Sequence, residues 1–296
     1  MINALTIDVE DYFQVTAFEG VVDRQDWAVY PSRVENNTRR VLDLLDEYPI
    51  KATFFVLGWV AERFPDIVLD IAKRGHEVAC HGYGHELVYN LGPEAFRADV
   101  QKSKAILEHL TGVPLLGYRA PSYSITEKSL WALDILIEEG FVYDSSIFPI
   151  IHDNYGIPGG ERFSHTLTRP AGSILEFPLT TLNLNLPGRK IALPIAGGGY
   201  LRLLPAGVIQ WGMRRINQIE QQPTVLYFHP WEIDPDQPRI KASLKSRFRH
   251  YVNLDTTEDK LRTLFKGLEF GTMSRVLELN GARGTGDVSG SGDATK

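Results

Sequence analysis

Acidic side chains near the N-terminus and two histidines further along the chain have the types and spacing of a metal-dependent hydrolase. The run Leu5–Asp11 has the pattern of a short strand that carries Asp8 and Glu10, and His81-Gly-Tyr-Gly-His85 holds two imidazoles four positions apart. Two neutral histidines and one carboxylate form a three-ligand site that leaves positions open for water and substrate. A second carboxylate beside such a site can act as a general base. The pattern predicts a hydrolytic metal centre.

Strand geometry sorts the acids of the first motif. Side chains alternate across a strand, so Asp8 and Glu10 share one face while Leu5, Ile7 and Val9 share the other. With the apolar face packed on outer helices, both acids point toward the mouth of a barrel. Asp11 falls on the opposite face unless a turn redirects it. Taken alone, two acids at this spacing would be interpreted as a solvated strand end.

The two histidines need a local bend before they can meet on one ion. They converge if the segment after the strand coils into a helical turn, and Gly82 and Gly84 would allow a tight loop there. An HxxxH motif alone is more often structural. Cys80 precedes the first histidine, but alternation turns it to the other face, so we interpret it as a small core residue rather than a ligand.

A third motif, Arg119-Ala-Pro-Ser-Tyr123, follows another strand. A guanidinium fixed there can pair with Asp8 and hold it ionised and oriented, although an ordinary salt bridge at a strand end would look the same. Tyr123 has the ring needed to stack on a sugar, but core packing is an equally simple interpretation.

The fourth and fifth motifs suggest a general acid. His229 ends the apolar run Leu226-Tyr-Phe, and its ordinary pKa near working pH suits protonation of a leaving amine. Asp144, after Phe141-Val-Tyr, is a candidate to orient that histidine. Trp231 is a second candidate for stacking on a sugar ring. The alternatives are a satisfied polar group for the histidine and loop anchoring for the tryptophan.

The elements that must position these residues alternate between strands and helices. We predict strands at 4–9, 51–57, 77–81, 115–119, 142–145, 174–182 and 224–229, and helices at 34–48, 60–74, 93–111 and 127–139. This alternation indicates parallel β/α units in a barrel or a doubly wound sheet. Because the polar motifs lie at or just after strand ends, a barrel is favoured.

Composition limits the class of protein. The 296 residues carry a formal net charge of −6, which gives no support to nucleic-acid binding. No apolar run is long enough to cross a membrane, and Met1 leads directly into a strand without a secretory signal pattern. The single cysteine excludes an internal disulfide framework. We therefore expect a cytoplasmic protein, peripheral to the inner membrane if its substrate is lipid-linked.

The domain organisation is expected to be simple. Residues 1–280 are predicted to form one barrel domain whose C-terminal extension, about 233–280, is helical. The Gly- and Pro-rich stretch 183–205 has the composition of an inserted loop or hairpin. Residues 281–296 are Gly, Ser, Asp and Thr with almost nothing apolar, which predicts a disordered tail.

Taken together and in order, an aspartate-bearing first strand, HxxxH, RxPxY, YDSS and a late strand ending in histidine resemble the polysaccharide deacetylase family (carbohydrate esterase family 4, the nodulation-deacetylase homology fold). The match extends over residues 3–232. The remainder and the run GGGYLRLLP resemble a bacterial branch associated with exosortase and exopolysaccharide gene clusters. The family implies an α/β fold, a distorted (β/α) barrel with fewer than eight repeats, and a bound divalent metal, Zn²⁺ or otherwise Co²⁺ or another cation.

The resemblance also implies site roles. The matches are base Asp8, paired arginine Arg119, metal ligands His81 and His85, catalytic acid His229 and acidic partner Asp144. One departure concerns the third metal ligand, because many members carry adjacent aspartates in the first motif and Val9 follows Asp8 here. The ligand must then be Glu10 or Asp11. We predict Glu10, which strand alternation favours, with Asp11 as the alternative.

The implied reaction removes N-acetyl groups from hexosamine units of a bacterial polysaccharide or its lipid-linked oligosaccharide precursor. A backbone N–H near Tyr123 is a candidate to hold the oxyanion. Hydrolysis of a small cyclic amide or ureide on the same fold is the main alternative, and a non-catalytic carbohydrate-binding protein is another. Two histidines and a carboxylate also describe non-haem iron oxygenases, but β/α alternation disfavours their all-β scaffold.

Overall fold

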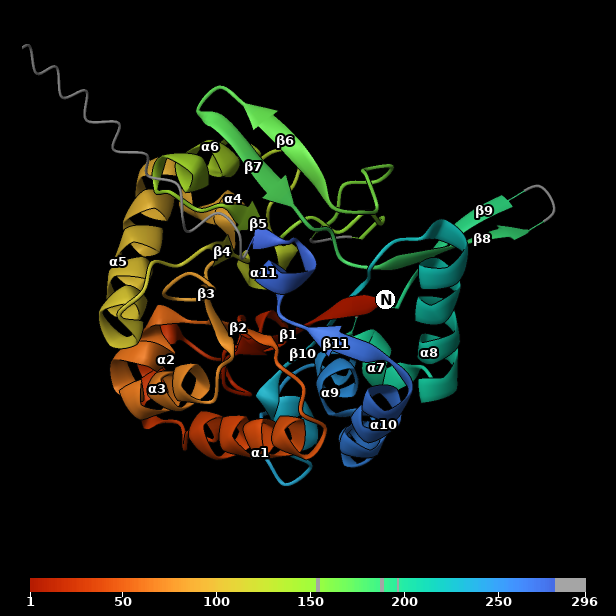
Figure 1. The fold of residues 1–296 in the computed structure, drawn as a ribbon. Coiled ribbons are helices and arrows are strands. Elements are labelled where there is room, and N and C mark those ends of the chain that lie inside the picture. Colours follow the sequence, from red (N-terminus) through yellow and green to blue (C-terminus); the bar gives the residue numbers. More distant parts are fainter. Residues whose placement is uncertain (153–154, 187–188, 196, 280–296) are drawn as a thin grey trace, which may run out of the picture.

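A largely parallel sheet forms the centre of the molecule (Figure 1). The computed structural model describes residues 1–152, 155–186, 189–195 and 197–279. Its strands pair in the order β10-β1-β2-β3-β4-β5-β7-β6, and only the β6–β7 pair of this sheet is antiparallel. The strands are β1 (Ile2–Val9), β2 (Thr53–Val56), β3 (Glu77–Cys80), β4 (Gly117–Tyr118), β5 (Tyr143–Asp144), β6 (His165–Arg169), β7 (Gly172–Glu176) and β10 (Val225–Phe228).

The sheet curls into a barrel whose last gap is bridged by a side chain. Thr180, beyond β7, donates its hydroxyl to the carbonyl of Val225 at 3.0 Å and accepts from the N–H of the same residue at 2.7 Å. The hydroxyl thereby takes the place of a strand neighbour for β10. The predicted distorted (β/α) barrel with fewer than eight repeats is confirmed for the described part of the chain.

Alternation along β1 separates two apolar layers, as predicted. Leu5, Ile7 and Val9 are fully buried in the cluster between the sheet and its outer helices. Ala4 belongs instead to the cluster that fills the barrel interior. Because Asp8 lies an even number of residues from Ala4, it projects into the same interior. The apolar pattern of this strand therefore sets the direction of the acidic side chain.

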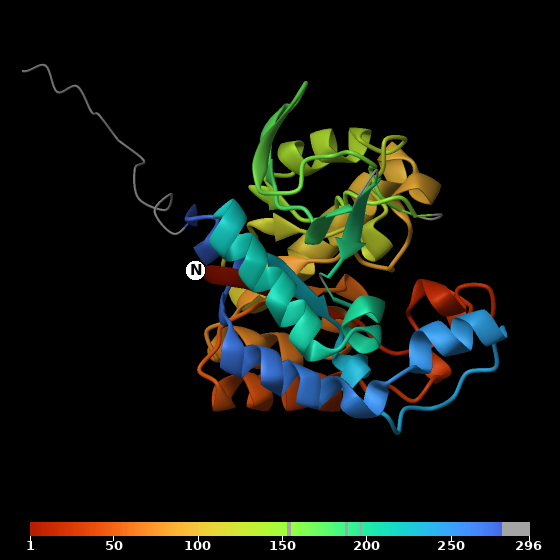
Figure 2. The same cartoon turned by 90° about the vertical axis from the view of Figure 1, so that its right-hand side faces the viewer.

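Helices surround the barrel (Figures 1 and 2). They are α1 (Val34–Glu47), α2 (Gly58–Arg63), α3 (Pro65–Lys73), α4 (Val88–Leu91), α5 (Pro93–Thr111), α6 (Trp131–Glu138), α7 (Gly199–Leu203), α8 (Ala206–Arg215), α9 (Leu244–Tyr251), α10 (Leu254–Gly267) and α11 (Met273–Val276). The single helix predicted at 60–74 is two helices, since Pro65 lacks an N–H and disfavours a helical conformation at Phe64, whose φ is −130°. The helix predicted at 127–139 begins only at Trp131.

The strand predicted at 174–182 is divided between two sheets. β7 ends at Glu176, and β8 (Thr181–Leu186) pairs antiparallel with β9 (Arg189–Pro194) in a separate hairpin. Pro178 lies in the break, where a residue without an N–H interrupts strand pairing. The hairpin and α7 occupy the region that we predicted as an insertion, and the hairpin projects from the barrel in Figure 1.

The C-terminal segment after residue 232 packs against the barrel and adds a strand to its sheet. A strand that sequence analysis missed, β11 (Glu269–Gly271), pairs in parallel with the first half of β1. At the start of α11, the N–H of Met273 donates to the Thr53 hydroxyl at 2.7 Å, and the N–H of Ser274 donates to Glu77 at 3.0 Å. These bonds close the end of the barrel opposite the site. The tail predicted at 281–296 lies outside the described residues.

Among the described helices, none combines the length and apolar character that a membrane crossing requires.

Candidate metal centre and catalytic site

The ion pair of Asp8 and Arg119 lies at the centre of the site. Arg119 directly follows β4, and its Nη1 donates to Asp8 Oδ1 at 2.7 Å and to the Thr6 hydroxyl at 2.8 Å. Nε and Nη2 donate to the carbonyl and the hydroxyl of Ser145 at 3.1 and 3.0 Å. Arg119 is fully buried and its guanidinium lies 4.2 Å from the ring centroid of Phe55. This network orients the Asp8 carboxylate, as the sequence suggested.

Glu10, His81 and His85 converge beside this ion pair. Their candidate ligand atoms all lie within 4.8 Å of one another, and the three side chains are buried. His85 Nε2 is 2.7 Å from Glu10 Oε2. Burial raises the pKa of Glu10, but the nearby imidazoles of His85 and His229 outweigh it and lower that pKa to about 2. The low pKa keeps the Glu10 carboxylate ionised beside the two imidazoles, and one carboxylate with two imidazoles is a donor set that binds a divalent cation.

The hydrogen bond of His81 leaves one ring nitrogen available for a metal. Its Nδ1 lies 2.8 Å from the carbonyl oxygen of Arg119. Since a carbonyl only accepts, Nδ1 carries the proton and the lone pair is on Nε2. Burial lowers the pKa of His81 to about 4, which keeps the imidazole neutral as a metal ligand must be. The donor set therefore fits a divalent metal on this chain's own geometry.

A loop, rather than a helical turn, brings His85 back toward His81. Gly82 has φ +72° and His85 itself has φ +50°, both in the left-handed region. Asp99 on α5 accepts from the N–H of Gly84 at 3.2 Å, while Arg24 donates to the carbonyls of Gly84 and His85 at 2.9 and 3.0 Å. The helical-turn expectation is wrong because these side chains satisfy the loop backbone from two sides.

Asp11 is occupied elsewhere. Its Oδ2 accepts from the Ser32 hydroxyl at 2.6 Å and from the N–H groups of Arg33 and Val34 at 2.9 and 3.3 Å. Those bonds satisfy donors at the start of α1, and burial raises the pKa of Asp11 to about 6. Of the two acids left open by the sequence, only Glu10 belongs to the group with the two histidines.

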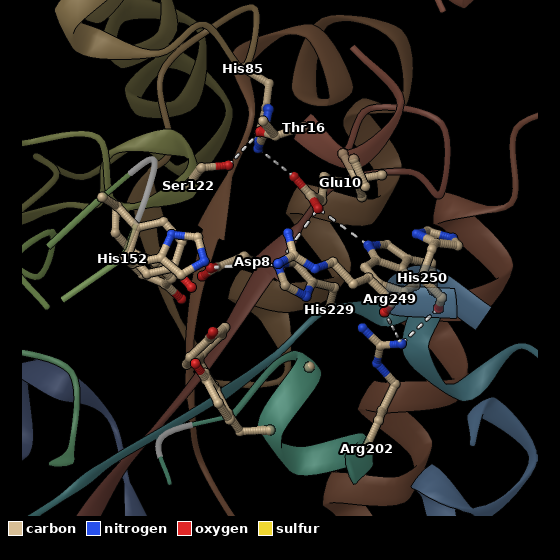
Figure 3. A pocket seen from close by; sticks show the side chains of 18 of the residues that line it. Asp8, Glu10, Thr16, His85, Ser122, His152, Arg202, His229, Arg249 and His250 are labelled. Carbon is tan, nitrogen blue, oxygen red and sulfur yellow. Dashed lines mark hydrogen bonds and ion pairs between the residues drawn. The ribbon is translucent and has the colours of Figure 1, made fainter. Parts of the chain in front are cut away.

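His229 follows β10 and faces both acids of the first motif (Figure 3). Its Nε2 lies 3.6 Å from Glu10 Oε1 and 3.9 Å from Asp8 Oδ2. On the other side of the ring, Nδ1 lies 2.7 Å from Glu232 Oε1. Burial lowers the pKa of His229, but Glu10, Glu232 and Asp8 outweigh it and raise the pKa to about 9. The ring is held as a proton donor at neutral pH.

Glu232 is a residue that sequence analysis missed. It lies three residues after His229, and its carboxylate also accepts from the His229 N–H at 3.0 Å, which completes a capping box at the short turn Pro230–Ile233. A capping residue followed by glutamate at the third position was a readable signal in the run His229-Pro-Trp-Glu232. The glutamate therefore fixes both the backbone and the ring of the histidine.

Arg202, also missed, anchors Glu232 from α7. Its Nε donates to Glu232 Oε2 at 2.7 Å, and both side chains are buried. The approach of α7 depends on Gly197, which has φ +148° and bridges to Tyr227; a Cβ there would lie 1.7 Å from the Tyr227 carbonyl oxygen. The glycine-rich run that starts this segment lets the backbone touch β10. Arg202 thereby reaches the catalytic end of the barrel.

Asp144 does not orient His229. Its Oδ1 accepts from the Ser146 hydroxyl at 2.5 Å, and that hydroxyl accepts from the N–H of Ala120 at 2.8 Å. Its neighbour in the sheet register is the buried Glu176, and Asp144 Oδ2 and Glu176 Oε2 have no hydrogen-bond donor among the described residues. Burial raises the pKa of Asp144 to about 6 and that of Glu176 well above its ordinary value. Asp144 thus supports the Arg119 segment, and Glu232 has the role that we expected of it.

Trp231 and Tyr123 line the cavity, but neither offers a free face of the kind predicted. Trp231 is 4% exposed and stacks on His229 and His250, with ring centroids 5.1 and 4.1 Å apart. Its Nε1 donates to Glu10 Oε1 at 3.2 Å, which supports the carboxylate. Tyr123 is buried against Tyr227, and its N–H donates to the Ala120 carbonyl at 3.0 Å, so this donor is already used.

A cavity of about 430 Å³ opens onto these groups. Asp8, Glu10, His81, His85 and His229 lie in its wall, which Figure 3 shows from close by. Further walls come from the segment 15–17, from α7 and from α9. A volume of this size suits a small ligand or one unit of a polymer. The cavity joins a candidate metal site, an oriented carboxylate and a histidine that donates a proton.

Comparison with protein families gives two matches. Residues 26–136 match the polysaccharide deacetylase family, and residues 145–278 match a domain of unknown function (DUF3473).

Two proteins named as deacetylases are similar to part of the chain. The chain is 38% identical over 165 residues to a peptidoglycan-N-acetylglucosamine deacetylase of Bacillus cereus, covering 52% of this chain and 58% of that protein. It is 32% identical over 125 residues to a peptidoglycan deacetylase of Helicobacter pylori, covering 42% of each. The chain therefore matches less than two thirds of the length of these relatives.

Solved structures share the fold. A Mycobacterium smegmatis protein assigned to the polysaccharide deacetylases superposes with a TM-score of 0.59 at 22% identity, covering 94% of this chain and 89% of the other. The Puue allantoinase superposes with a TM-score of 0.56 at 14% identity, covering 95% and 90%. At these identities the likeness concerns the barrel fold.

Proposed function

We propose that the chain, whose residues 26–136 match the polysaccharide deacetylase family, is a member of that family and a metal-dependent hydrolase that removes N-acetyl groups from hexosamine units of a bacterial polysaccharide or its precursor. The observation that carries this proposal is the convergence of Glu10, His81 and His85 within 4.8 Å of one another beside Asp8. The named relatives, which act on peptidoglycan by their names, support the class of substrate.

The metal is proposed to be Zn²⁺, held by Glu10 Oε2, His81 Nε2 and His85 Nε2. Two imidazoles and one carboxylate suit zinc and also accommodate cobalt. The hydrogen bond from His81 Nδ1 to the Arg119 carbonyl and the bond from Trp231 Nε1 to Glu10 provide outer support for two of the ligands. A divalent ion held by these three residues would polarise a carbonyl and make water more acidic.

Asp8 is proposed as the general base. Arg119 holds Oδ1 at 2.7 Å, so Oδ2 is the oxygen available to accept a proton from water. That oxygen lies on the side of His229, whose Nε2 is 3.9 Å away. The buried guanidinium cannot lose its own proton, so the pair remains oriented as the base takes up a proton.

His229 is proposed as the general acid that protonates the departing amine. Its Nδ1 proton is held by Glu232, so the Nε2 proton is the one that can be transferred to a leaving group in the cavity. Arg202 keeps Glu232 in position from the opposite side. The products are acetate and a free amino sugar, and the released amine is cationic near neutral pH.

The test is acetate release from N-acetylglucosamine oligomers and from a lipid-linked N-acetylhexosamine precursor. Metal-stripped protein would be assayed with Zn²⁺, with Co²⁺ and with no addition, and Asp8→Asn would be assayed alongside. We expect release that depends on metal and that falls about a thousandfold in Asp8→Asn, since loss of a general base costs about 10²–10⁴. The metal content of the variant, measured by atomic absorption, should equal that of the wild type.

Two results would contradict the proposal. Acetate release that survives metal removal would separate the activity from Glu10, His81 and His85. An absence of release from every acetylated sugar, with one metal bound per chain, would redirect the search to small cyclic ureides or to a binding role.

A further inference from the structure

α9 brings a cationic side chain into the wall of the catalytic cavity. Arg249 lines the cavity, and Arg202 Nη1 donates to the carbonyls of Arg249 and His250 at 2.8 and 2.7 Å (Figure 3). The ring of His250 stacks on Trp231 at 4.1 Å. The backbone at Arg249 is therefore hydrogen-bonded to the same buried Arg202 that anchors Glu232. These bonds fix the position of the Arg249 backbone beside the cavity.

The guanidinium of Arg249 has no acidic partner among the residues that the structure describes. The chain around it supplies only cations: between Asp236 and Asp255 the charged residues are Arg239, Lys241, Lys245, Arg247 and Arg249. On a protein with a net charge of −6, this segment is a local positive surface.

The three carboxylates of the site have partners of their own without Arg249. Asp8 is paired with Arg119 at 2.7 Å, and Glu10 lies in the group of proposed metal ligands, with its Oε2 2.7 Å from His85 Nε2. Glu232 is paired with Arg202 at 2.7 Å. The positive charge of Arg249 therefore remains available to a ligand in the cavity.

Two phenol groups border the same part of the cavity. Tyr155 and Tyr200 both line it. Burial raises the pKa of each hydroxyl and Arg249 opposes that rise, so the guanidinium is within electrostatic range of both and both remain donors at neutral pH. Guanidinium and hydroxyl groups are donors that bind carboxylate or phosphate oxygens.

We propose that Arg249, Tyr155 and Tyr200 form a subsite for an anionic group, a carboxylate or a phosphate, joined covalently to the N-acetylhexosamine or to its neighbour. The subsite rests on the deacetylase function proposed above and names its substrate class as an acidic glycan or a phosphate-linked sugar. It also gives the C-terminal segment a function, because α9 supplies the cation.

The test compares three substrates at constant ionic strength. They are a neutral N-acetylglucosamine oligomer, an oligomer in which N-acetylglucosamine alternates with glucuronate, and uridine diphosphate N-acetylglucosamine. The variants are Arg249→Gln, Arg249→Lys and the matched control Arg247→Gln, which removes an exposed cation from the same helix outside the cavity. The measured quantity is kcat/KM for each anionic substrate divided by that for the neutral oligomer.

We expect this ratio to exceed one in the wild type and to fall roughly five- to tenfold in Arg249→Gln. A loss of this size lies between that expected for an exposed ion pair and that expected for a charge-assisted hydrogen bond. The change should be in KM and should shrink as salt is added. Arg249→Lys should recover part of the ratio and Arg247→Gln all of it. Which anionic substrate responds distinguishes a carboxylate from a phosphate ligand.

The proposal is overturned if Arg249→Gln leaves the ratio unchanged, or if Arg247→Gln lowers it equally, which would indicate a diffuse basic surface. Failure of the deacetylase function is separable, because it would show as no acetate from any of the three substrates. In that case calorimetry still tests the subsite. It measures binding of the glucuronate oligomer and of uridine diphosphate N-acetylglucosamine to Asp8→Asn, with and without Arg249→Gln. Loss of binding with Arg249→Gln supports it, and equal binding refutes it.

Discussion

The same substitution at two fully buried glutamates should change stability in opposite directions. Glu176 lies beside Asp144 in the sheet register, and burial together with the nearby Asp144 carboxyl raises its pKa well above the ordinary value. Glu232 is also fully buried, but Arg202 and His229 outweigh burial and lower its pKa. At Glu176, Glu→Gln removes a carboxyl group whose ionised form burial disfavours. At Glu232, the same change removes a negative charge that Arg202 and His229 require.

The sign and size follow from linkage. Because the folded pKa of Glu176 is raised, its contribution to stability is fully present below the unfolded value near 4.5 and is lost as pH rises toward the folded pKa. The loss is about 1.4 kcal/mol per pH unit, and no more than about 3.4 kcal/mol at pH 7. In Glu176→Gln the new amide can donate to Asp144 and accept from the Ile147 N–H, which lies 3.0 Å from Glu176 Oε1. Glu176→Gln should therefore be more stable than the wild type by about 1–3 kcal/mol at pH 7.

Glu232→Gln should be less stable by about 3–5 kcal/mol at pH 7, because it leaves the buried Arg202 without its counter-charge. The assay is urea unfolding of the wild type and both variants at pH 5, 6, 7 and 8, with reversibility checked at each pH. The advantage of Glu176→Gln should shrink toward pH 5. If instead Glu176→Gln were destabilising by the same amount as Glu232→Gln at every pH, the raised pKa of Glu176 would be refuted.

Three further outcomes are expected. Glu10→Ala should weaken Zn²⁺ affinity more than about 100-fold with little effect on the free energy of unfolding, whereas Asp11→Ala should keep metal binding and lose about 2 kcal/mol of stability. Zinc titration and urea unfolding of both variants test this, and the reasoning is wrong if the two effects are exchanged. Gly197→Ala should cost more than about 2 kcal/mol and most of the acetate release, since its Cβ would collide with Tyr227; a crystal structure with α7 in place would refute the argument. Burial lowers the pKa of His76 to about 4, so the stability that its neutral form contributes is present above pH 6.5 and is lost as pH falls to 4. Over that range, urea unfolding should show the wild type losing about 3 kcal/mol of stability relative to His76→Asn, and parallel pH profiles for the two proteins would contradict this prediction.

Much of the site could be predicted from local patterns. The directions of Asp8 and Glu10 follow from strand alternation, which needs only the apolar residues between them. Arg119, His81 and His229 could be assigned to one end of the barrel because each follows a strand, and parallel strands end at the same edge. These are properties of short segments, so the sequence was sufficient for them.

Other interpretations failed where a distant residue decided the outcome. Asp144 was expected beside His229, but the register of β5 and β7 pairs it with Glu176. Trp231 was expected to stack on sugar, but α9 brings His250 against its ring. Pattern alone does not tell which side chain from a later segment will occupy a given face.

The sequence by itself determined which end of which strand carries the chemistry, because alternation and strand ends are local consequences of backbone geometry. Only the tertiary structure decided the partners: Glu232 and Arg202 for the general acid, Ser32 and the start of α1 for Asp11, and Arg249 for the cavity wall. Those contacts depend on how distant segments of the chain fold back over the first strand. A charge or hydrogen bond acts over a few ångströms in space, and no spacing along the chain records that distance.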